Sequence, residues 1–254
     1  MPYFLPFWTL LNKEVQRWFV SPIQTLIAPM ITSSLYLFIF GLSLGKRISV
    51  GTDITYIQFV VPGLVLMGVL NNTFANSSFS LFMSRYLGHM VDLLVTPIGP
   101  AQFIIAYTLA SILRGLVVGG AILFISCFFT TLPLHAPWLA FLMAGLASFM
   151  IAQLGIIAGI CSDSFEAISI YTTFLLLPLI YLGGMFYPIS ILPSFWQGLS
   201  RFNPLFYTID GFRHCLVGVG DAPIAMSFMV SGAISIVLFL WAAALLSSGY
   251  NMRK

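Results

Sequence analysis

The residues of this sequence that could do chemistry form no complete catalytic set. Residues 41–45 read GLSLG and fit the G-x-S-x-G pattern of a serine nucleophile, but here the pattern closes an apolar run, whereas a nucleophile elbow needs a strand, a turn and a helix to expose the serine. Gly45, Lys46 and Arg47 hint at a phosphate loop, yet the spacing to Gly41 is one residue short and Arg47 replaces the magnesium-binding Ser or Thr. We therefore predict that this chain does not bind ATP.

Cysteine and histidine add no metal site. The three cysteines and three histidines are scattered, without C-x-x-C, Cys/His ligand or HExxH spacing. The net charge of +3 is spread along the chain without a basic block, which does not suggest nucleic-acid binding. A membrane-embedded hydrolase or acyltransferase would need a nucleophile and a base close together on helices, and the sequence shows no such pair. We expect no metal, no disulfide framework and no enzyme activity.

The low content of charged residues predicts which structural elements hold the polar residues in place. Hydrophobic residues make up 59% of the chain and charged residues only 7%, whereas a soluble domain carries roughly a quarter charged residues. About 20 apolar residues cross a bilayer core, and the charge-free runs each hold one or two such lengths. The predicted fold is therefore an all-α membrane protein, a single transmembrane domain over residues 1–254 with six spans at 24–44, 56–79, 101–128, 138–160, 167–185 and 223–246.

Three further segments lie between or before the spans. Residues 1–20 predict an amphipathic helix at the membrane surface, because apolar residues recur there at helical spacing opposite a polar side. Residues 81–100 predict a cytoplasmic loop with a short helix. Residues 186–222 are too polar to span and too apolar for a free loop, so we expect short re-entrant helices that dip in from the outer face. Pro178 should kink the fifth span.

Six spans place both termini on one side of the membrane. With the termini in the cytoplasm, five Lys or Arg residues lie inside and four outside, or two outside if the dipping segment is set aside. We expect a multi-pass protein of the bacterial cytoplasmic (inner) membrane with both termini cytoplasmic.

Arg114 stands near the middle of the third predicted span. A charge there costs about 2.5 to 3.5 kcal/mol on insertion scales, so it must be paired or wetted. It either contacts an anionic part of a substrate or forms a structural pair with a polar group on a neighbouring span.

The second predicted span carries a polar face. On a helix Asn72, Asn76 and Ser80 fall on one side, since residues four apart are neighbours. Such a face is costly against lipid, so it should point into the protein or toward a partner subunit. It serves either interhelical hydrogen bonding or the lining of a substrate path. Together with Arg114, Asn72 and Asn76 are our candidates for a translocation path.

Two parts of the sequence carry family motifs. Residues 82–97 read FMSRYLGHMVDLLVTP, with an arginine followed by an acidic residue, Leu-Leu and Pro. Before the last span stand YLGGMFYP at 181–188, LPSFW at 192–196, Asn203-Pro204 and Gly211-Phe-Arg213. These motifs resemble the membrane subunits of ABC-2 type exporters, in the NodJ-like and YadH-like bacterial branch, over nearly the whole chain. The sequence departs from the family at Ser84 and at Asp92, where Glu is usual.

The resemblance implies the ABC-2 exporter fold, a homodimer, and two copies of a separate cytoplasmic ATPase that holds ATP and Mg. The N-terminal helix and the 81–100 loop would contact that ATPase, although an ordinary cytoplasmic loop is the alternative. The coupling residues implied are Lys13, Arg17, Arg85, His89, Asp92, Leu93, Leu94 and Pro97. The 186–222 segment would form an outward gate, with Tyr187, Pro188, Phe195, Trp196, Asn203 and Arg213.

The predicted function is the permease subunit of an ATP-binding cassette exporter. A stand-alone secondary transporter or channel is the alternative, but ion coupling calls for intramembrane acidic residues, and every Asp and Glu falls outside or at the ends of the predicted spans. The family favours an amphipathic or lipid-linked cargo such as a drug, glycolipid or lipo-oligosaccharide.

Overall fold

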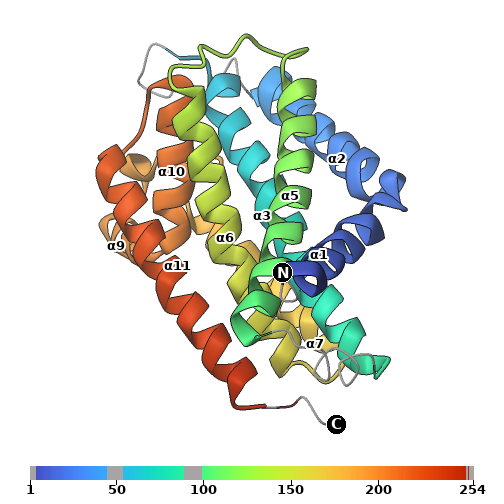
Figure 1. Ribbon diagram of the computed structural model, residues 1–254. Coiled ribbons are helices and arrows are strands. Elements are labelled where there is room, and N and C mark those ends of the chain that lie inside the picture. Colours follow the sequence, from blue (N-terminus) through green and yellow to red (C-terminus); the bar gives the residue numbers. More distant parts are fainter. Residues whose placement is uncertain (1–3, 45–53, 89–98, 250, 252–254) are drawn as a thin grey trace.

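The computed structural model describes residues 4–44, 54–88, 99–249 and 251, and these fold into helices without a strand. Figure 1 shows the helices as one bundle, with the C-terminus and the α6–α7 turn at its lower end and the α5–α6 connection at its upper end. Six helical segments are long and apolar enough to cross a membrane: Ile23–Gly41, Tyr56–Tyr86, Pro100–Ser126, Pro137–Cys161, Phe165–Leu182 and Ile224–Ser247. The prediction of an all-helical membrane protein with six spans is confirmed.

The chain begins with α1 (Phe4–Phe19), which packs along α5. A bend at Ser21 leads into the first span, made of η1 (Ile23–Ile27), α2 (Ala28–Tyr36) and η2 (Leu37–Leu44). The Thr25 hydroxyl donates to the Trp18 carbonyl across the bend (3.3 Å). Helix η1 has wide i→i+5 turns immediately before Pro29, because a proline has no N–H for the usual bond and its ring crowds the carbonyl four residues earlier.

The central helix is α3 (Tyr56–Tyr86), most of which is buried. It starts with Gln58 Oε1 accepting from the Thr55 backbone N–H (2.9 Å). It continues past residue 79, where we had placed its end, so the connection to the third span starts after Tyr86 rather than at residue 81. The helix tolerates its serine-rich end because Ser77 and Ser78 donate back to the carbonyl of Phe74 within the helix.

Small residues let α5 (Pro100–Ser126) and α6 (Pro137–Cys161) approach α3 closely. A Cβ added at Gly115 would lie 3.0 Å from the Val69 carbonyl oxygen, and one at Gly159 would lie 2.8 Å from that of Ser78. Backbone-to-backbone contact of this kind is typical of helix packing in membranes. Gly115 and Gly159 thus let both helices lie directly against the backbone of α3.

The fifth span consists of α7 (Phe165–Ile170), η3 (Tyr171–Leu176) and α8 (Leu177–Leu182). Ser164 caps α7 by accepting from the Ala167 N–H (3.1 Å). The wide turns of η3 lead into Pro178, with the Leu177 N–H bonded to the Thr172 carbonyl. As in the first span, the proline distorts the helix that contains it.

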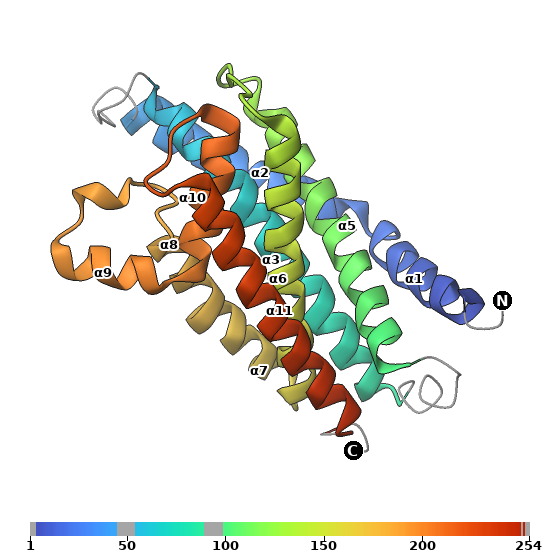
Figure 2. The same ribbon diagram turned by 60° about the vertical axis from the view of Figure 1, so that its left-hand side comes forward.

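Three short helices fill the segment before the last span: η4 (Ile189–Ile191), α9 (Ser194–Phe202) and α10 (Pro204–Val217). Helix α10 is almost wholly buried against α3, α6 and α11 (Ile224–Ser247), whereas α9 stands out from the side of the bundle (Figure 2). The α5–α6 connection is fixed to the end of α10 by bonds from His135 N to Leu216 O (3.2 Å) and from Ala136 N to Cys215 O (2.8 Å).

The spans differ in how much of them the chain itself covers. In the most apolar stretch of α3 and of α6, 67% of residues are buried, compared with 17% in the first span, 17% in the fifth and 22% in α11. The first, fifth and sixth spans therefore present most of their surface to lipid or to another chain.

Candidate functional site

Asn76, on the buried side of α3, is the centre of a polar cluster inside the bundle. Its Oδ1 accepts from Arg17 Nη2 of α1 (2.9 Å) and from Arg114 Nη1 of α5 (3.4 Å), and its Nδ2 donates to Ser111 Oγ (3.0 Å). Arg17, which the family resemblance assigned to ATPase coupling, thus meets two of the predicted translocation residues. Three helices that are far apart in sequence share one amide side chain.

Glu14 supplies the carboxylate of this cluster. It is 1% exposed, lies 3.2 Å from Arg17 Nε, and accepts a hydrogen bond from the Ser80 hydroxyl. Leu10, Glu14 and Trp18 are all buried and stand four residues apart, so they form the face of α1 that meets the bundle. The sequence analysis did not identify Glu14, although this spacing could have shown that it shares a face with two large apolar residues.

A polar groove opens between α2, α3 and α5 at membrane depth, with a volume of about 300 Å³. Asn72 lies in it, four residues from Asn76, and its Nδ2 donates to the Gly68 carbonyl (3.1 Å). The other polar side chains of the groove are Gln24, Thr32, Ser33, Tyr36 and Asn71. Polar groups are rare in a surface that meets lipid, so this groove is distinct from the apolar surface that the first span otherwise exposes.

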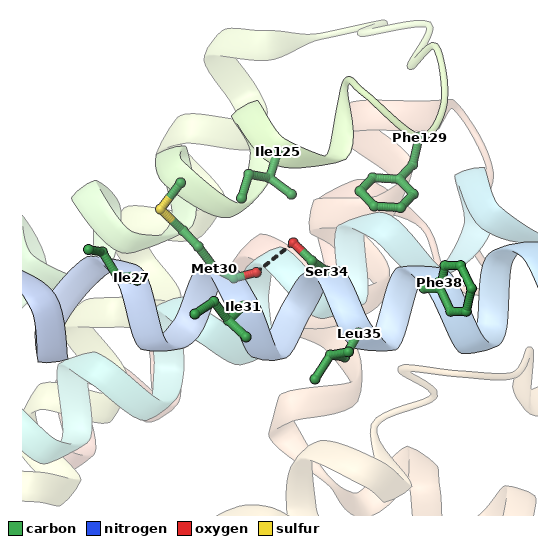
Figure 3. A pocket seen from close by; sticks show the side chains of 8 residues that line it. All are labelled: Ile27, Met30, Ile31, Ser34, Leu35, Phe38, Ile125 and Phe129. Carbon is green, nitrogen blue, oxygen red and sulfur yellow. Dashed lines mark hydrogen bonds between the residues drawn. The ribbon is translucent and has the colours of Figure 1, made fainter.

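Beside it, an apolar groove of about 470 Å³ lies between the first span and the end of α5. Figure 3 shows its lining, with Ile125 and Phe129 facing a row of side chains from the first span. The one hydroxyl in it, that of Ser34, donates to the Met30 carbonyl of its own helix (2.7 Å). This groove therefore offers packing area without hydrogen-bonding groups, in contrast to the polar groove.

Arg85 closes the lower end of α6. Its guanidinium is buried and donates to the carbonyls of Gly159, Ile160 and Ser162, and it lies 3.5 Å from Asp163. These are carbonyls that a helix end leaves without partners. Arg85 therefore fastens α3 to the α6–α7 turn, rather than standing free on a loop.

The remaining predicted coupling residues divide into two groups. Lys13 is exposed on α1, beside Arg17, whose side chain is 39% exposed. The others, His89, Asp92, Leu93, Leu94 and Pro97, lie outside the residues that the structure describes.

At the upper end, Arg213 of α10 holds the re-entrant segment against α3. It is 1% exposed, donates to the carbonyls of Phe59 (3.3 Å) and Gly184 (2.5 Å), and its guanidinium lies 3.9 Å from the centre of the Phe59 ring. Burial lowers the pKa of Arg213 to about 10, which leaves it charged at neutral pH. Its counter-charge is Asp210 at 3.6 Å.

Asp210 in turn fixes the chain that leads into α11. It is fully buried and accepts from the backbone N–H groups of Asp221 (2.9 Å) and Ala222 (2.8 Å). Burial raises the pKa of the Asp210 carboxyl, and these bonds and Arg213 oppose that rise. The sequence analysis missed Asp210, although it stands three residues before Arg213 on a helix, the spacing of an ion pair.

Of the other predicted gate residues, Asn203 is a buried helix cap and the remaining four are half-buried or exposed. Asn203 is buried, caps α10 by accepting from Leu205 N (3.0 Å), and donates to the Leu179 carbonyl (2.5 Å). Tyr187 and Pro188 are half-buried, and the Tyr187 hydroxyl donates to the Tyr181 carbonyl (3.1 Å). Phe195 and Trp196 lie on α9, 72% and 44% exposed.

Comparison with known protein families decides what kind of protein this is. The ABC-2 type transporter family matches residues 6–217, which is most of the chain. The chain belongs to the ABC-2 type transporter family. Among the curated proteins, this ABC-2 transporter is 36% identical over 252 residues to the inner membrane transport permease YadH of Escherichia coli (strain K12), covering 99% of this chain and 98% of that one.

More distant relatives of this ABC-2 transporter include Nodulation protein J of Rhizobium leguminosarum bv. viciae, 21% identical over 241 residues, with 92% and 91% of the two chains covered. Nodulation protein J of Rhizobium meliloti (strain 1021) is 22% identical over 240 residues. The family and the six apolar helices make the chain a multi-pass transport permease of the membrane. Permeases of this family generally work with an ATPase subunit.

Proposed function

We propose that this chain is the membrane-spanning subunit of an exporter that moves an amphipathic or lipid-linked substrate, such as a drug, glycolipid or lipo-oligosaccharide, out across the cytoplasmic membrane. The observation that carries the proposal is the polar groove between α2, α3 and α5, which is lined by Asn71 and Asn72. A substrate with a polar head and an apolar tail needs such a surface inside an otherwise apolar bundle, because a polar group in hydrocarbon without a partner costs several kcal/mol.

A second copy of the chain covers this groove. The Thr32 hydroxyl donates to the Ala28 carbonyl of its own helix (3.0 Å), but lipid cannot satisfy the amide groups of Asn71 and Asn72 that face the groove, so the groove needs a protein cover. The first span, whose Ile27, Ile31 and Leu35 are exposed beside it, gives a broad apolar surface for that contact. The substrate path then lies between two copies, with the polar grooves facing each other.

Work comes from a separate ATPase that holds ATP and Mg and binds the lower end, which is the cytoplasmic side. When the two ATPase copies close on ATP, the movement reaches the spans by two routes. One is α1, through Lys13 and Arg17, and the other is the connection between α3 and α5. The contacts that support this role are those of α1 itself: through Glu14 and Arg17 it is bonded to α3, so a force on α1 reaches Asn76 directly. Arg85 acts by holding the start of that connection against α6.

The outward gate is formed by η4, α9 and α10 at the upper end. Buried Arg213 and Asn203 act as its fixed base, through their bonds to Gly184 and Leu179. The aromatic side chains of Phe195 and Trp196 lie at the outer membrane interface, where aromatic residues are favoured.

The test is ATP-driven efflux in proteoliposomes that contain this chain and the ATPase that co-purifies with it. We expect efflux of an amphipathic cargo that stops when the ATPase carries a substitution in its catalytic site. Asn71→Leu and Asn72→Leu should abolish efflux with the complex still assembled. Thr173→Leu, a similar change on the exposed surface of the fifth span outside the groove, serves as the control and should retain it. Efflux that proceeds without hydrolysis would refute the proposal.

One observation favours a second candidate, a secondary transporter. Glu14 is a buried carboxylate packed against α3 and α5, and carboxylates at membrane depth carry protons in ion-coupled transporters. Its ion pair with Arg17 (3.2 Å) gives it a structural role as well. Efflux driven by a proton gradient in liposomes that lack the ATPase, and lost in Glu14→Gln, would establish this candidate instead.

A further inference from the structure

Arg114 has donor groups that the protein does not use. Its Nη1 makes one long bond to Asn76 Oδ1 (3.4 Å), an acceptor that already takes a shorter bond from Arg17 (2.9 Å). Its Nε is buried without a hydrogen-bond partner. A guanidinium has five donors, and leaving them unmade away from water is costly. The ion pairs found among the described side chains do not include Arg114.

Charge is unbalanced at the same place. Arg17 and Arg114 share one acceptor, and Glu14 is the carboxylate beside them, bonded to Arg17 and Ser80. The other carboxylates in the described part of the chain lie at the α6–α7 turn or in the re-entrant segment. One carboxylate with two guanidiniums leaves a positive charge uncompensated. Because water screens Arg17, which is 39% exposed, the less exposed Arg114 is the group that lacks a counter-charge.

The position suits contact with a passing molecule. Arg114 is 14 residues along α5 from Pro100, which at about 1.5 Å per residue is roughly 21 Å into the span. Asn76 lies four residues along α3 from Asn72 in the polar groove, so the cluster is about one helical turn from that groove. Arg114 itself is partly exposed, so an acceptor can reach it from the surface of the subunit.

We propose that Arg114, with Arg17 beside it, binds an oxyanion carried by the substrate, so that the exported amphiphile is anionic, with a phosphate or carboxylate head. A planar guanidinium suits such groups, because its parallel N–H donors match two oxygens. This inference rests on the proposed export function and specifies its substrate class. The competing role for Arg114, a purely structural pair with Asn76, requires no anion.

The test is binding to the purified full-length chain in phosphatidylcholine nanodiscs, without ATPase or ATP. The probe is dodecyl phosphate, and dodecyl maltoside is the neutral amphiphile of equal chain length. We expect saturable binding of dodecyl phosphate, and Arg114→Gln should weaken it roughly tenfold or more. The same substitution should leave the binding of dodecyl maltoside unchanged. Arg201→Gln removes an exposed arginine of α9 and is the matched control that should bind as the wild type does.

Two further arms separate the alternatives. Arg114→Lys keeps the charge but loses the two-pronged donor, so its affinity should fall between those of wild type and Arg114→Gln, and it gives a reading if Arg114→Gln does not fold. Inorganic phosphate should bind far more weakly than dodecyl phosphate, and equal affinity would overturn the assignment to an amphiphile. Unchanged dodecyl phosphate binding in Arg114→Gln would overturn the inference, and efflux that continued in that case would leave the export function standing.

Discussion

Glu14 is a buried carboxylate whose ion-pair partner, Arg17, is partly exposed. Glu14→Gln keeps the shape of the side chain but removes the charge opposite Arg17. Breaking a fully buried pair costs about 3–5 kcal/mol, and because Arg17 is 39% exposed we expect roughly 2 kcal/mol here. Thermal unfolding in detergent should show a midpoint lower by several degrees.

Lys13→Gln, which removes an exposed charge from the same helix, is the control for that experiment and should leave the midpoint almost unchanged. The double variant Glu14→Gln with Arg17→Gln tests the pairing itself. Since Arg17 also bonds Asn76, pairing is shown when the loss of stability in the double variant is smaller than the sum of the losses in Glu14→Gln and Arg17→Gln. Additive losses would contradict the pairing.

Arg213 and Asp210 form a second ion pair, at the upper end, and both side chains are buried. Arg213→Met leaves Asp210 buried without its counter-charge, which should cost about 3–5 kcal/mol and reduce the amount of folded protein in the membrane. Arg213→Lys keeps the charge but cannot reach the Phe59 and Gly184 carbonyls together, so its midpoint should fall between those of wild type and Arg213→Met. Size-exclusion chromatography and thermal unfolding measure both effects, with Arg201→Met as control. Wild-type stability of Arg213→Met would show that the buried pair does not hold the segment.

At the scale of elements, the packing of α6 on α3 depends on glycines at particular positions. A Cβ at Gly159 would stand 2.8 Å from the Ser78 carbonyl oxygen, while one at Gly145 on the same helix would meet nothing within 4 Å. We therefore expect Gly159→Ala to destabilise the protein by about 1–3 kcal/mol and Gly145→Ala to be neutral or slightly stabilising, since Ala is the better helix former. Equal unfolding midpoints for the two variants would mean that the helices separate to accept the methyl group.

The six spans could be predicted from the sequence because apolar runs of about 20 residues rarely form anything other than membrane-spanning helices. The prediction failed at the end of α3, because a loop is predicted from residue 81 whereas the helix continues to Tyr86, with Leu81, Phe82 and Ser84 buried. It also treated Arg85 as a surface contact, since sequence does not reveal that the carbonyls at the end of α6 lie within its reach. Pairings across helices depend on helix rotation and register, which hydropathy does not determine.

At the scale of the whole molecule, buried and exposed helices divide the bundle into a core and a surface. Helices α3 and α6 form the core, while the first, fifth and sixth spans remain largely uncovered. The polar groove lies at the margin between the two, where α2 meets α3. Because this polar surface lies at the edge of the subunit, a second copy of the chain must cover it. In the proposed function, transport therefore requires the dimer.

The proposed orientation places the upper end of the bundle outside the cell and the lower end in the cytoplasm. Thr131 lies in the exposed connection at the upper end and Ser248 just after α11 at the lower end. In a variant with Cys127, Cys161 and Cys215 replaced by Ala, a membrane-impermeant maleimide should label Thr131→Cys in intact spheroplasts but Ser248→Cys only after permeabilisation. This follows because the Lys and Arg residues assigned to the lower end favour the cytoplasm. The reversed pattern would contradict the proposed orientation, with the ATPase at the lower end, and labelling of both sites in intact spheroplasts would contradict six spans.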